Sequence, residues 1–184
     1  MTKIFVSAVI DASIEKVWAQ VRDFNNMPDW HPKFSRSHIE GGLPGDQVGC
    51  IRNFDIAGGG GTIRERLLEL SDLDHSFRYS ILTSPLPVKG YVAQLTLYPV
   101  TVGNKTVGIW TAEFEVTNDD EAGVVDAVAN GTFGKAFEVL NDRLAKRRTV
   151  RVPAGPILLN GDRTAYANGG FNETGIPQRP DAAG

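Results

Sequence analysis

The chain has 184 residues, of which 41% are hydrophobic and 22% are charged, and its formal net charge is −3. This length fits one domain with some chain to spare, and the composition is that of an ordinary globular protein. The weak negative charge argues against a basic surface for nucleic acid or for anionic membranes, so we expect neither partner.

Cysteine count and hydropathy exclude further classes. Cys50 is the only cysteine, so neither an internal disulfide nor a multi-cysteine metal site can form. No apolar run approaches the roughly 20 residues that cross a bilayer, and we expect no membrane insertion. Met1 leads directly into a predicted strand without a hydrophobic signal segment. We therefore expect a cytoplasmic location.

The first 32 residues predict one strand and two short helices. Residues 4–10 favour a strand, and Ser13 can cap a helix whose apolar residues recur at helical spacing from Ile14 to Val21. A second, shorter helix is expected over 24–30, ending before Pro32. Two short helices after one strand, followed by a long β region, predict an α+β domain.

Alternating apolar residues then predict a series of antiparallel strands. Together with 4–10 they make about seven, and the later ones are expected at 34–40, 48–56, 62–70, 76–82, 90–99 and 106–116. Helical spacing from Val125 to Leu144 predicts one long helix of about five turns. A curved sheet wrapped around this helix would bury the apolar faces of both.

The composition changes after Arg148. Residues 149–184 are rich in Gly, Pro and Asn and carry one short apolar run at 156–159. We expect an irregular arm or tail there, distinct from a domain over 1–148. An arm of this kind can dock on a second subunit, so a homodimer through it is one expectation. A role in protein interaction is then a third functional hypothesis.

Two connectors differ from ordinary hairpin turns. Residues 57–61 are nearly all glycine, whereas residues 84–88 read Ser-Pro-Leu-Pro-Val and are stiff and apolar. On one curved sheet, a mobile loop and an apolar loop favour two covers over a cavity. A simple flexible hairpin explains the glycine run equally well.

Short motifs in this order resemble the START-like, pollen-allergen-like superfamily, in its bacterial polyketide cyclase/dehydrase branch. The resemblance covers residues 3 to about 147 and implies the helix-grip fold, but it does not imply one activity. The motifs that carry it are Val17-Trp18, Trp30-His31-Pro32, Gly49-Cys50-Ile51-Arg52, Glu65-Arg66-Leu67, Ser84-Pro85-Leu86-Pro87-Val88 with Tyr91, and Val107-Gly108-Ile109-Trp110.

The core also resembles the plant abscisic-acid receptors. The resemblance places 56–61 at their mobile gate loop, 85–88 at their latch loop and Glu65 at a pocket carboxylate. The gate is shorter here, and the lysine that anchors the hormone's carboxylate has no counterpart, because Ser35 lies near that position. The hormone-receptor role is therefore not carried over.

Strand alternation predicts which residues face the interior. If Glu65 points inward, so does Arg52 on the preceding strand, close enough to interact with it. The same counting turns inward Tyr79, Tyr91 and the odd-numbered residues from Ile109 to Glu115. A mostly apolar interior with a few polar groups is typical of a small-molecule site. The expected ligand-binding residues are Trp30, Arg52, Phe54, Ile56, Glu65, Tyr79, Ile81, Leu86, Pro87, Tyr91, Glu113, Phe133 and Phe137.

Three residues are candidates for proton transfer: Glu65, His31 and Tyr79. Glu65 with Arg52 is either a structural ion pair or a ligand clamp, and a ligand that shares the pair could make Glu65 a base. His31 titrates near neutral pH and is either a general acid/base or a helix-end hydrogen-bonding group. Tyr79 and Tyr91 are either cavity wall or acids.

The sequence contains no pattern that indicates a metal site or a nucleotide-binding site. His31, His38 and His75 are dispersed, so with one cysteine we expect no metal site. The chain has no phosphate-binding P-loop, no dinucleotide G-x-G-x-x-G between strand and helix, and no G-x-S-x-G elbow. We expect no cofactor.

Two functions follow. The first is a module that binds a hydrophobic polyketide, aromatic or lipid-like molecule in a cavity gated by the 57–61 and 84–88 loops. The second is a cofactor-independent cyclase, dehydratase or isomerase in which Glu65, His31 or a tyrosine moves a proton. Since one fold hosts both, we favour binding and leave catalysis open.

Overall fold

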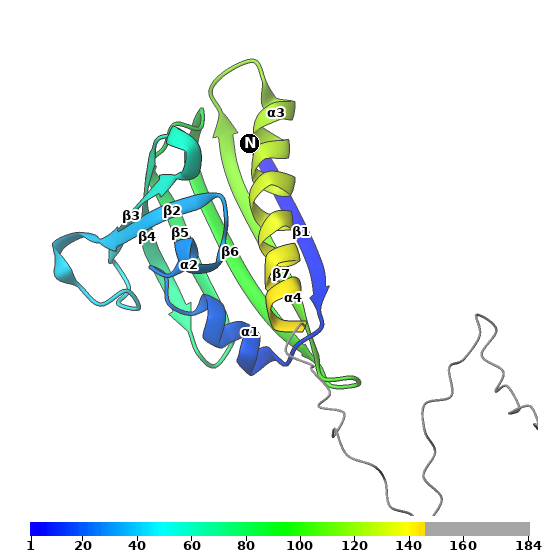
Figure 1. Ribbon diagram of the computed structural model, residues 1–184. Helices are drawn as coiled ribbons and strands as arrows, with labels where there is room; N and C mark the ends of the chain where they lie inside the picture. The colour runs from blue at the N-terminus through cyan, green and yellow to red at the C-terminus, as the bar shows by residue number, and fades with distance from the viewer. Residues whose placement is uncertain (146–184) are drawn as a thin grey trace, which may run out of the picture. The chain divides into compact units, whose positions relative to one another are not determined.

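The computed structural model describes residues 1–145, which form a curved seven-stranded sheet with a long helix along its concave face (Figure 1). All paired neighbours are antiparallel, and their order is β1-β7-β6-β5-β4-β3-β2. This confirms the predicted α+β helix-grip class, whereas the expected arm at 149–184 lies outside the described residues. The strands are β1 (Thr2–Ile10), β2 (Phe34–Ile39), β3 (Ile51–Ile56), β4 (Thr62–Ser71), β5 (Ser76–Thr83), β6 (Val88–Val100) and β7 (Lys105–Val116).

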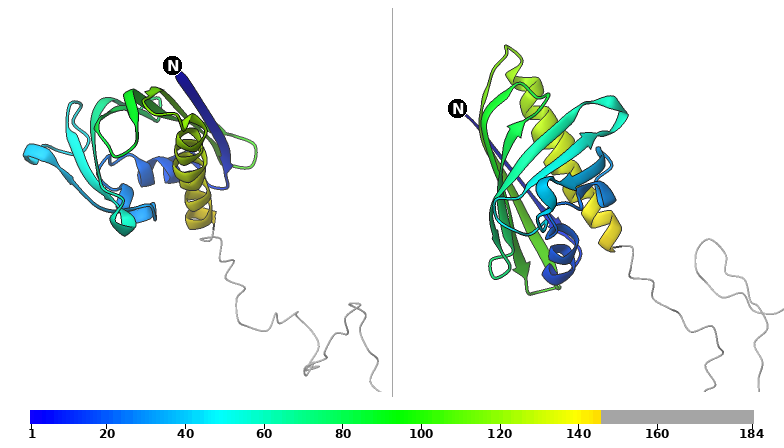
Figure 2. Two further views of the ribbon diagram at one scale, coloured as in Figure 1. Left: turned by 90° about the horizontal axis from the view of Figure 1, so that it is seen from above. Right: turned by 90° about the vertical axis from the view of Figure 1, so that its left-hand side faces the viewer.

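Two short helices follow β1, and a long one follows β7, as predicted. Figure 2 shows the sheet curving around this last helix. Asp120 caps its start by accepting a hydrogen bond from the Gly123 N–H at 2.9 Å. No helix within 1–145 is long and apolar enough to cross a membrane. The helices are α1 (Ile14–Val21), α2 (Met27–Trp30), α3 (Glu121–Val128) and α4 (Lys135–Ala145), with a π-helical turn at Ala129–Gly134.

The π-helical turn between α3 and α4 is a feature that the apolar spacing did not predict. Val128 and Phe133 are both buried although they are five residues apart, one more than an α-helical turn brings to the same face. The wider turn therefore keeps Phe133, Phe137 and Leu140 facing the sheet after Val128. It also displaces Thr132 and Val128 toward the space between helix and sheet, which they help to line.

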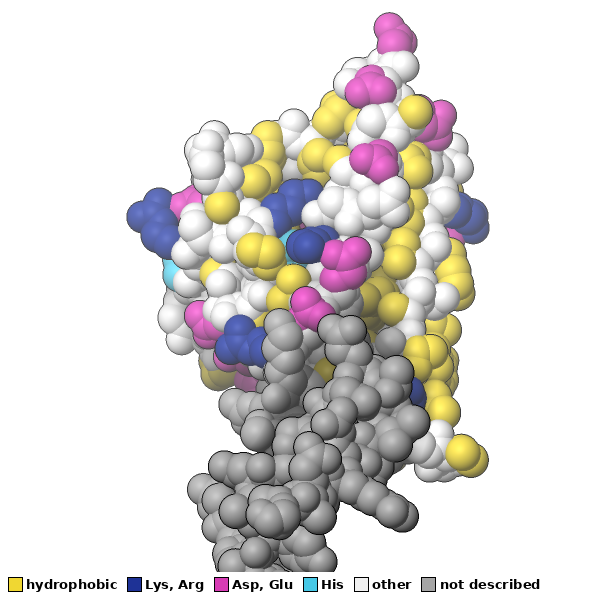
Figure 3. Space-filling model, turned by 45° about the vertical axis from the view of Figure 1, so that its right-hand side comes forward, with side chains coloured by type: hydrophobic (Ala, Val, Ile, Leu, Met, Phe, Trp, Pro, Cys, Tyr) yellow, Lys and Arg dark blue, Asp and Glu magenta, His cyan; other side chains and the backbone are white. Residues whose placement is uncertain are grey.

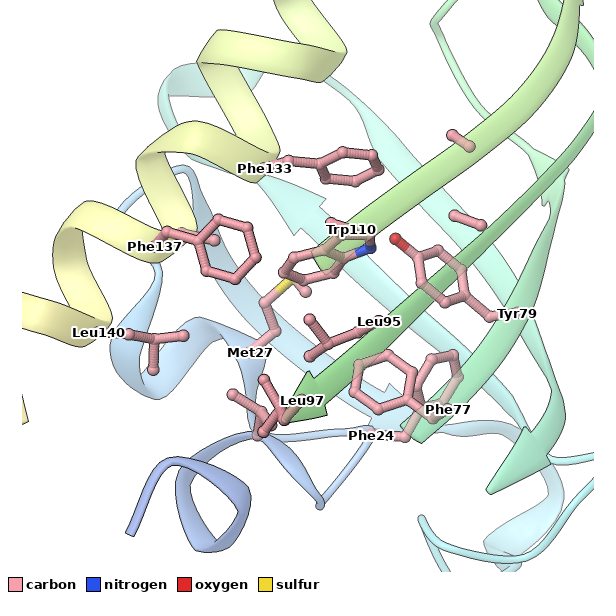
Figure 4. Close-up of a cluster of buried hydrophobic side chains, with 14 of the residues drawn as sticks. Phe24, Met27, Phe77, Tyr79, Leu95, Leu97, Trp110, Phe133, Phe137 and Leu140 are labelled. Carbon is pink, nitrogen blue, oxygen red and sulfur yellow. The ribbon is translucent and has the colours of Figure 1, made fainter. Parts of the chain in front are cut away.

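An aromatic cluster fixes the helix to the sheet. Trp110 stacks on Phe133 with ring centroids 4.8 Å apart, and its edge meets Phe137 at 6.0 Å (Figure 4). Gly108, two residues earlier on β7, permits this close approach, since a Cβ there would overlap the Phe137 ring. The helix thus packs tightly against one half of the sheet.

The predicted inward face of β7 is wrong by one residue. Trp110, Ala112 and Phe114 are buried, whereas Glu113 is exposed and its carboxylate pairs with Lys3 at 2.8 Å. Because side chains alternate, a shift of one residue turns the whole set over. Apolar residues occupy both faces of this strand near Ile109, so alternation alone was ambiguous. Glu113 and Glu115, which are exposed, were the residues that indicated the outward face of this strand.

Candidate functional site

A cavity lies between the concave face of the sheet and the first half of the long helix. At its inner end Arg52, Glu65, Tyr79 and Tyr91 are almost fully buried. At its outer end half-buried side chains lead toward the surface. The lining residues are Met27, Lys33, Phe34, Arg52, Phe54, Ile56, Ile63, Glu65, Tyr79, Ile81, Leu86, Tyr91, Val128 and Thr132.

Eight of the expected ligand-binding residues therefore share one cavity: Arg52, Phe54, Ile56, Glu65, Tyr79, Ile81, Leu86 and Tyr91. The inward faces of β3, β4, β5 and β6 are those that alternation predicted. That these residues contact a ligand remains a prediction.

Arg52 and Glu65 form a buried ion pair at the inner end. They are direct cross-strand partners on β3 and β4, and Glu65 Oε2 accepts from Nε at 2.8 Å and from Nη2 at 2.5 Å. Arg52 also donates to the Phe24 carbonyl at 2.6 Å, and its guanidinium lies 3.8 Å above the Phe24 ring. Burial raises the pKa of Glu65, which Arg52 opposes. Within residues 1–145 no hydrogen bond reaches Glu65 Oε1, so this oxygen is available to a ligand.

Tyr79 on β5 and Tyr91 on β6 present two hydroxyl groups beside this pair. Burial raises the pKa of both phenols, and the nearby Glu65 charge raises it further, so both remain protonated at neutral pH. The two hydroxyls lie close enough to interact with each other. Figure 4 shows the Tyr79 hydroxyl turned toward the indole nitrogen of Trp110. That Nε1 is buried and has no acceptor among the described residues.

Lys33, directly before β2, is a cavity residue that the sequence analysis missed. Its Nζ donates to Thr132 Oγ1 at 2.7 Å and to the Ala127 carbonyl at 3.2 Å. No carboxylate of the described residues lies within salt-bridge distance, and burial lowers its pKa. An ammonium has three protons, so one remains free. In the sequence, the feature that could have indicated a buried position for this lysine is its place between Pro32 and the apolar Phe34.

The acid/base role hypothesised for His31 remains a prediction, and its surroundings favour the alternative, a helix-end hydrogen-bonding group. The ring is fully buried but does not line the cavity. Nδ1 accepts from the Lys33 backbone N–H at 3.2 Å, and Nε2 lies 3.1 Å from the Thr132 carbonyl, to which it donates as the neutral tautomer. Burial lowers the pKa of His31, so the imidazole stays neutral. Through these contacts His31 ties the end of α2 to the π turn.

This environment predicts a pH dependence of stability. Because the folded pKa of His31 lies below the ordinary value of about 6.5, the unfolded chain binds its proton first as the pH falls. Stability is therefore complete above that value and declines toward the lower folded pKa, by up to about 1.4 kcal/mol per pH unit. Urea unfolding between pH 7 and pH 5 should show this slope. His31→Gln should flatten it, whereas a change at the exposed His38, His38→Gln, should not. Equal slopes in all three proteins would contradict the assignment.

Other expected ligand-binding residues lie elsewhere. Phe133 and Phe137 pack on Trp110 in the core, and Glu113 is on the outer face of β7. Trp30, the last residue of α2, is buried but does not line the cavity, and its Nε1 donates to Asn26 Oδ1 at 3.2 Å. Pro87 does not line the cavity, although its neighbour Leu86 does. These positions follow from the π turn, from the shifted face of β7 and from the direction of the 84–88 loop.

The two unusual loops meet beside the cavity. Ile56, directly before the first loop, and Leu86, in the middle of the second, line it. A Cβ on Gly61, whose φ of +96° favours glycine, would lie 3.3 Å from Pro85 Cγ. The glycine loop is exposed throughout. The loops are thus positioned as neighbouring covers, and their gating role remains a prediction. Among residues 1–145 there is no cluster of metal-binding side chains.

The sequence of this chain matches a known family over nearly the whole described region. The matching profile describes polyketide cyclase / dehydrase and lipid transport proteins and covers residues 1–148. The chain belongs to this family.

Individual relatives are more distant. The abscisic acid receptor PYL7 of Arabidopsis thaliana is 26% identical over 144 residues, which are 74% of this chain and 66% of the receptor. The chain thus spans slightly less than two thirds of that relative. Protein XoxI of Bacillus cereus is 26% identical, with a TM-score of 0.71 over 80% of this chain and 98% of XoxI.

Norcoclaurine synthase of Thalictrum flavum, solved with dopamine and hydroxybenzaldehyde, has the same fold. It is 14% identical, with a TM-score of 0.62 over 80% of this chain and 88% of the synthase. Its similarity concerns the fold alone. A plant receptor and a plant enzyme with this architecture illustrate why the fold does not decide between binding and catalysis.

Proposed function

We propose that this protein binds a small, largely apolar molecule with an acidic group in the cavity beneath the 57–61 and 84–88 loops. The composition of the cavity wall supports this most directly: it is chiefly aliphatic and aromatic, with one more cation than anion.

The charge balance favours an anionic ligand. Arg52 and Glu65 compensate each other, whereas Lys33 has only neutral acceptors within residues 1–145. A partly buried ammonium without a counter-ion is unfavourable, and an acidic ligand group at its third proton would offset this cost. On the face of the molecule shown in Figure 3, by contrast, basic and acidic side chains are interspersed.

Two fluorescent probes of similar shape test this proposal. N-phenyl-1-naphthylamine is neutral, and 1-anilinonaphthalene-8-sulfonate adds one negative charge. We expect both to bind, and we expect Lys33→Met to weaken binding of the sulfonate about tenfold or more while the neutral probe changes little, because a charge-assisted hydrogen bond is lost. Lys16→Met, an exposed change on α1, is the matched control.

The results separate the two parts of the proposal. If neither probe binds, the cavity is not a binding site of this kind. If the neutral probe binds and Lys33→Met affects both probes equally, Lys33 does not bind an acidic group of the ligand, and that part of the proposal is wrong.

A cytoplasmic location and a homodimer through 149–184 remain predictions.

A second candidate function is a cofactor-independent cyclase or dehydratase with Glu65 as the base. It is favoured by the unbonded Glu65 Oε1 and by the raised pKa of this carboxyl group, which lies at the inner end of an apolar cavity. Exchange of the methyl protons of acetophenone in deuterated buffer, followed by NMR, tests it. Catalysed exchange that Glu65→Gln abolishes would support the enzyme. Exchange at the buffer rate in both proteins would count against it.

A further inference from the structure

The inner end of the cavity presents polar atoms with hydrogen-bonding capacity left over. Glu65 Oε1 accepts no hydrogen bond from residues 1–145. The hydroxyls of Tyr79 and Tyr91 line the same cavity and interact with each other, and the Tyr79 hydroxyl also faces Trp110 Nε1. Each hydroxyl can donate once and accept twice, so capacity remains for a ligand group placed beside Glu65.

The sheet register shows how these groups come together. Tyr79 lies opposite Ala93 on β6, and Ala93 lies opposite Ala112 on β7. Both alanines are buried, and their small side chains leave the Tyr79 hydroxyl uncovered on that side. Tyr91, two residues before Ala93 on β6, projects from the same face. It is held there by stacking on Phe114, with ring centroids 5.2 Å apart.

Donor and acceptor capacities restrict the group that fits. The indole N–H of Trp110 can only donate, and the Tyr79 hydroxyl toward which it points can accept from it and donate its own proton onward. An ionised Glu65 Oε1 can only accept. The ligand group must therefore accept from a tyrosine and donate to Glu65.

A hydroxyl group meets both conditions. A carbonyl cannot donate to Glu65, and an ammonium cannot accept from a tyrosine. A carboxylate would place a second negative charge beside Glu65 in a buried site. We infer that the inner end of the cavity is a recognition site for a hydroxyl group on a ring of the ligand, a phenol or an enol, bound by Tyr79, Tyr91 and Glu65.

This inference rests on the proposed binding function and adds which chemical group of the ligand lies at the inner end of the cavity. It predicts a ligand with an acidic group toward Lys33, an apolar ring system between, and a hydroxyl at the tyrosines. Tyr79 and Tyr91 would be specificity-determining residues. Their removal should change which ligand is preferred more than whether an apolar ligand binds.

Two pairs of neutral compounds, each differing by a hydroxyl or a methyl group, test the inference: 2-naphthol against 2-methylnaphthalene, and 4-phenylphenol against 4-methylbiphenyl. Each is titrated as a competitor of N-phenyl-1-naphthylamine. We expect the hydroxyl compound of at least one pair to bind about tenfold more tightly or better, the gain typical of hydrogen bonds that include a charged group. Tyr79→Phe and Tyr91→Phe should reduce this preference, and the double variant should abolish it. The control Tyr98→Phe, an exposed tyrosine on the same strand β6, should leave it unchanged.

The outcomes distinguish this inference from the function on which it rests. If the neutral probe binds but neither hydroxyl compound is preferred, the hydroxyl site is refuted and the binding function stands. The same holds if the preference survives in the Tyr79→Phe/Tyr91→Phe double variant. If N-phenyl-1-naphthylamine itself does not bind, the proposed function fails and the inference fails with it.

Discussion

Replacing Arg52 by methionine is expected to lower the free energy of unfolding by about 3–5 kcal/mol, the cost typical of leaving one member of a buried ion pair uncompensated. Glu65 Oε2 would lose both of its hydrogen bonds, and the Phe24 carbonyl would lose its side-chain donor. Urea unfolding of the 184-residue chain measures the change. The expected effect is large because both side chains are almost fully buried.

Two further variants make this result specific. Arg52→Met/Glu65→Leu should recover most of the lost stability, since no unpaired charge remains. It should also abolish any preference for hydroxylated ligands. Arg36→Met removes the exposed ion pair with Asp55 and should cost less than about 1 kcal/mol. If Arg52→Met cost no more than Arg36→Met, the buried pair would not have the structural role described.

Filling the cavity is expected to have the largest effect on binding. Ile81 is half-buried on β5 and lines the cavity, so Ile81→Trp would place an indole where a ligand ring should lie. We expect affinity for N-phenyl-1-naphthylamine to fall about 100-fold or more, since most of the apolar contact area of a ligand this size would be lost. Fluorescence titration measures this loss.

The neighbouring position supplies the control. Leu82 is also half-buried on β5, but it does not line the cavity. Leu82→Trp should leave the affinity within about threefold of that of the unchanged protein. Both variants should remain folded, because overpacking typically costs about 1–3 kcal/mol. Equal binding by Ile81→Trp and Leu82→Trp would place the ligand elsewhere.

Most of the fold could be predicted from local patterns. Alternation is clear where one face of a strand is apolar and the other charged, as with Ile63 and Leu67 against Arg64 and Arg66. Glu65 was expected to face inward from the resemblance to a pocket carboxylate, and the inward position of Arg52 then followed from alternation across the hairpin. The seven strands and the final helix follow from such segments.

The incorrect predictions, for the inward face of β7 and for the regular helix, have physical causes that cannot be read from the spacing of apolar residues. β7 carries apolar residues on both faces, so its alternation has two solutions, and the incorrect one placed Glu113 inside. The π turn inserts one residue into the helix, which no regular 3.6-residue spacing anticipates. It brings Thr132 within reach of Lys33 and His31, and thereby sets the roles of both. Those contacts are tertiary, and local sequence does not specify them.

The most direct test of the account is a methyl NMR titration of isoleucine-labelled protein with N-phenyl-1-naphthylamine. Ile56, Ile63 and Ile81 line the cavity, whereas Ile14 lines an open groove near α1 and Ile109 faces outward from β7. If the ligand binds in the cavity, we expect large chemical-shift changes at the three cavity isoleucines and small ones at Ile14 and Ile109. Shifts centred on Ile14, with the cavity signals unchanged, would show that the ligand binds the outer groove and would contradict the account.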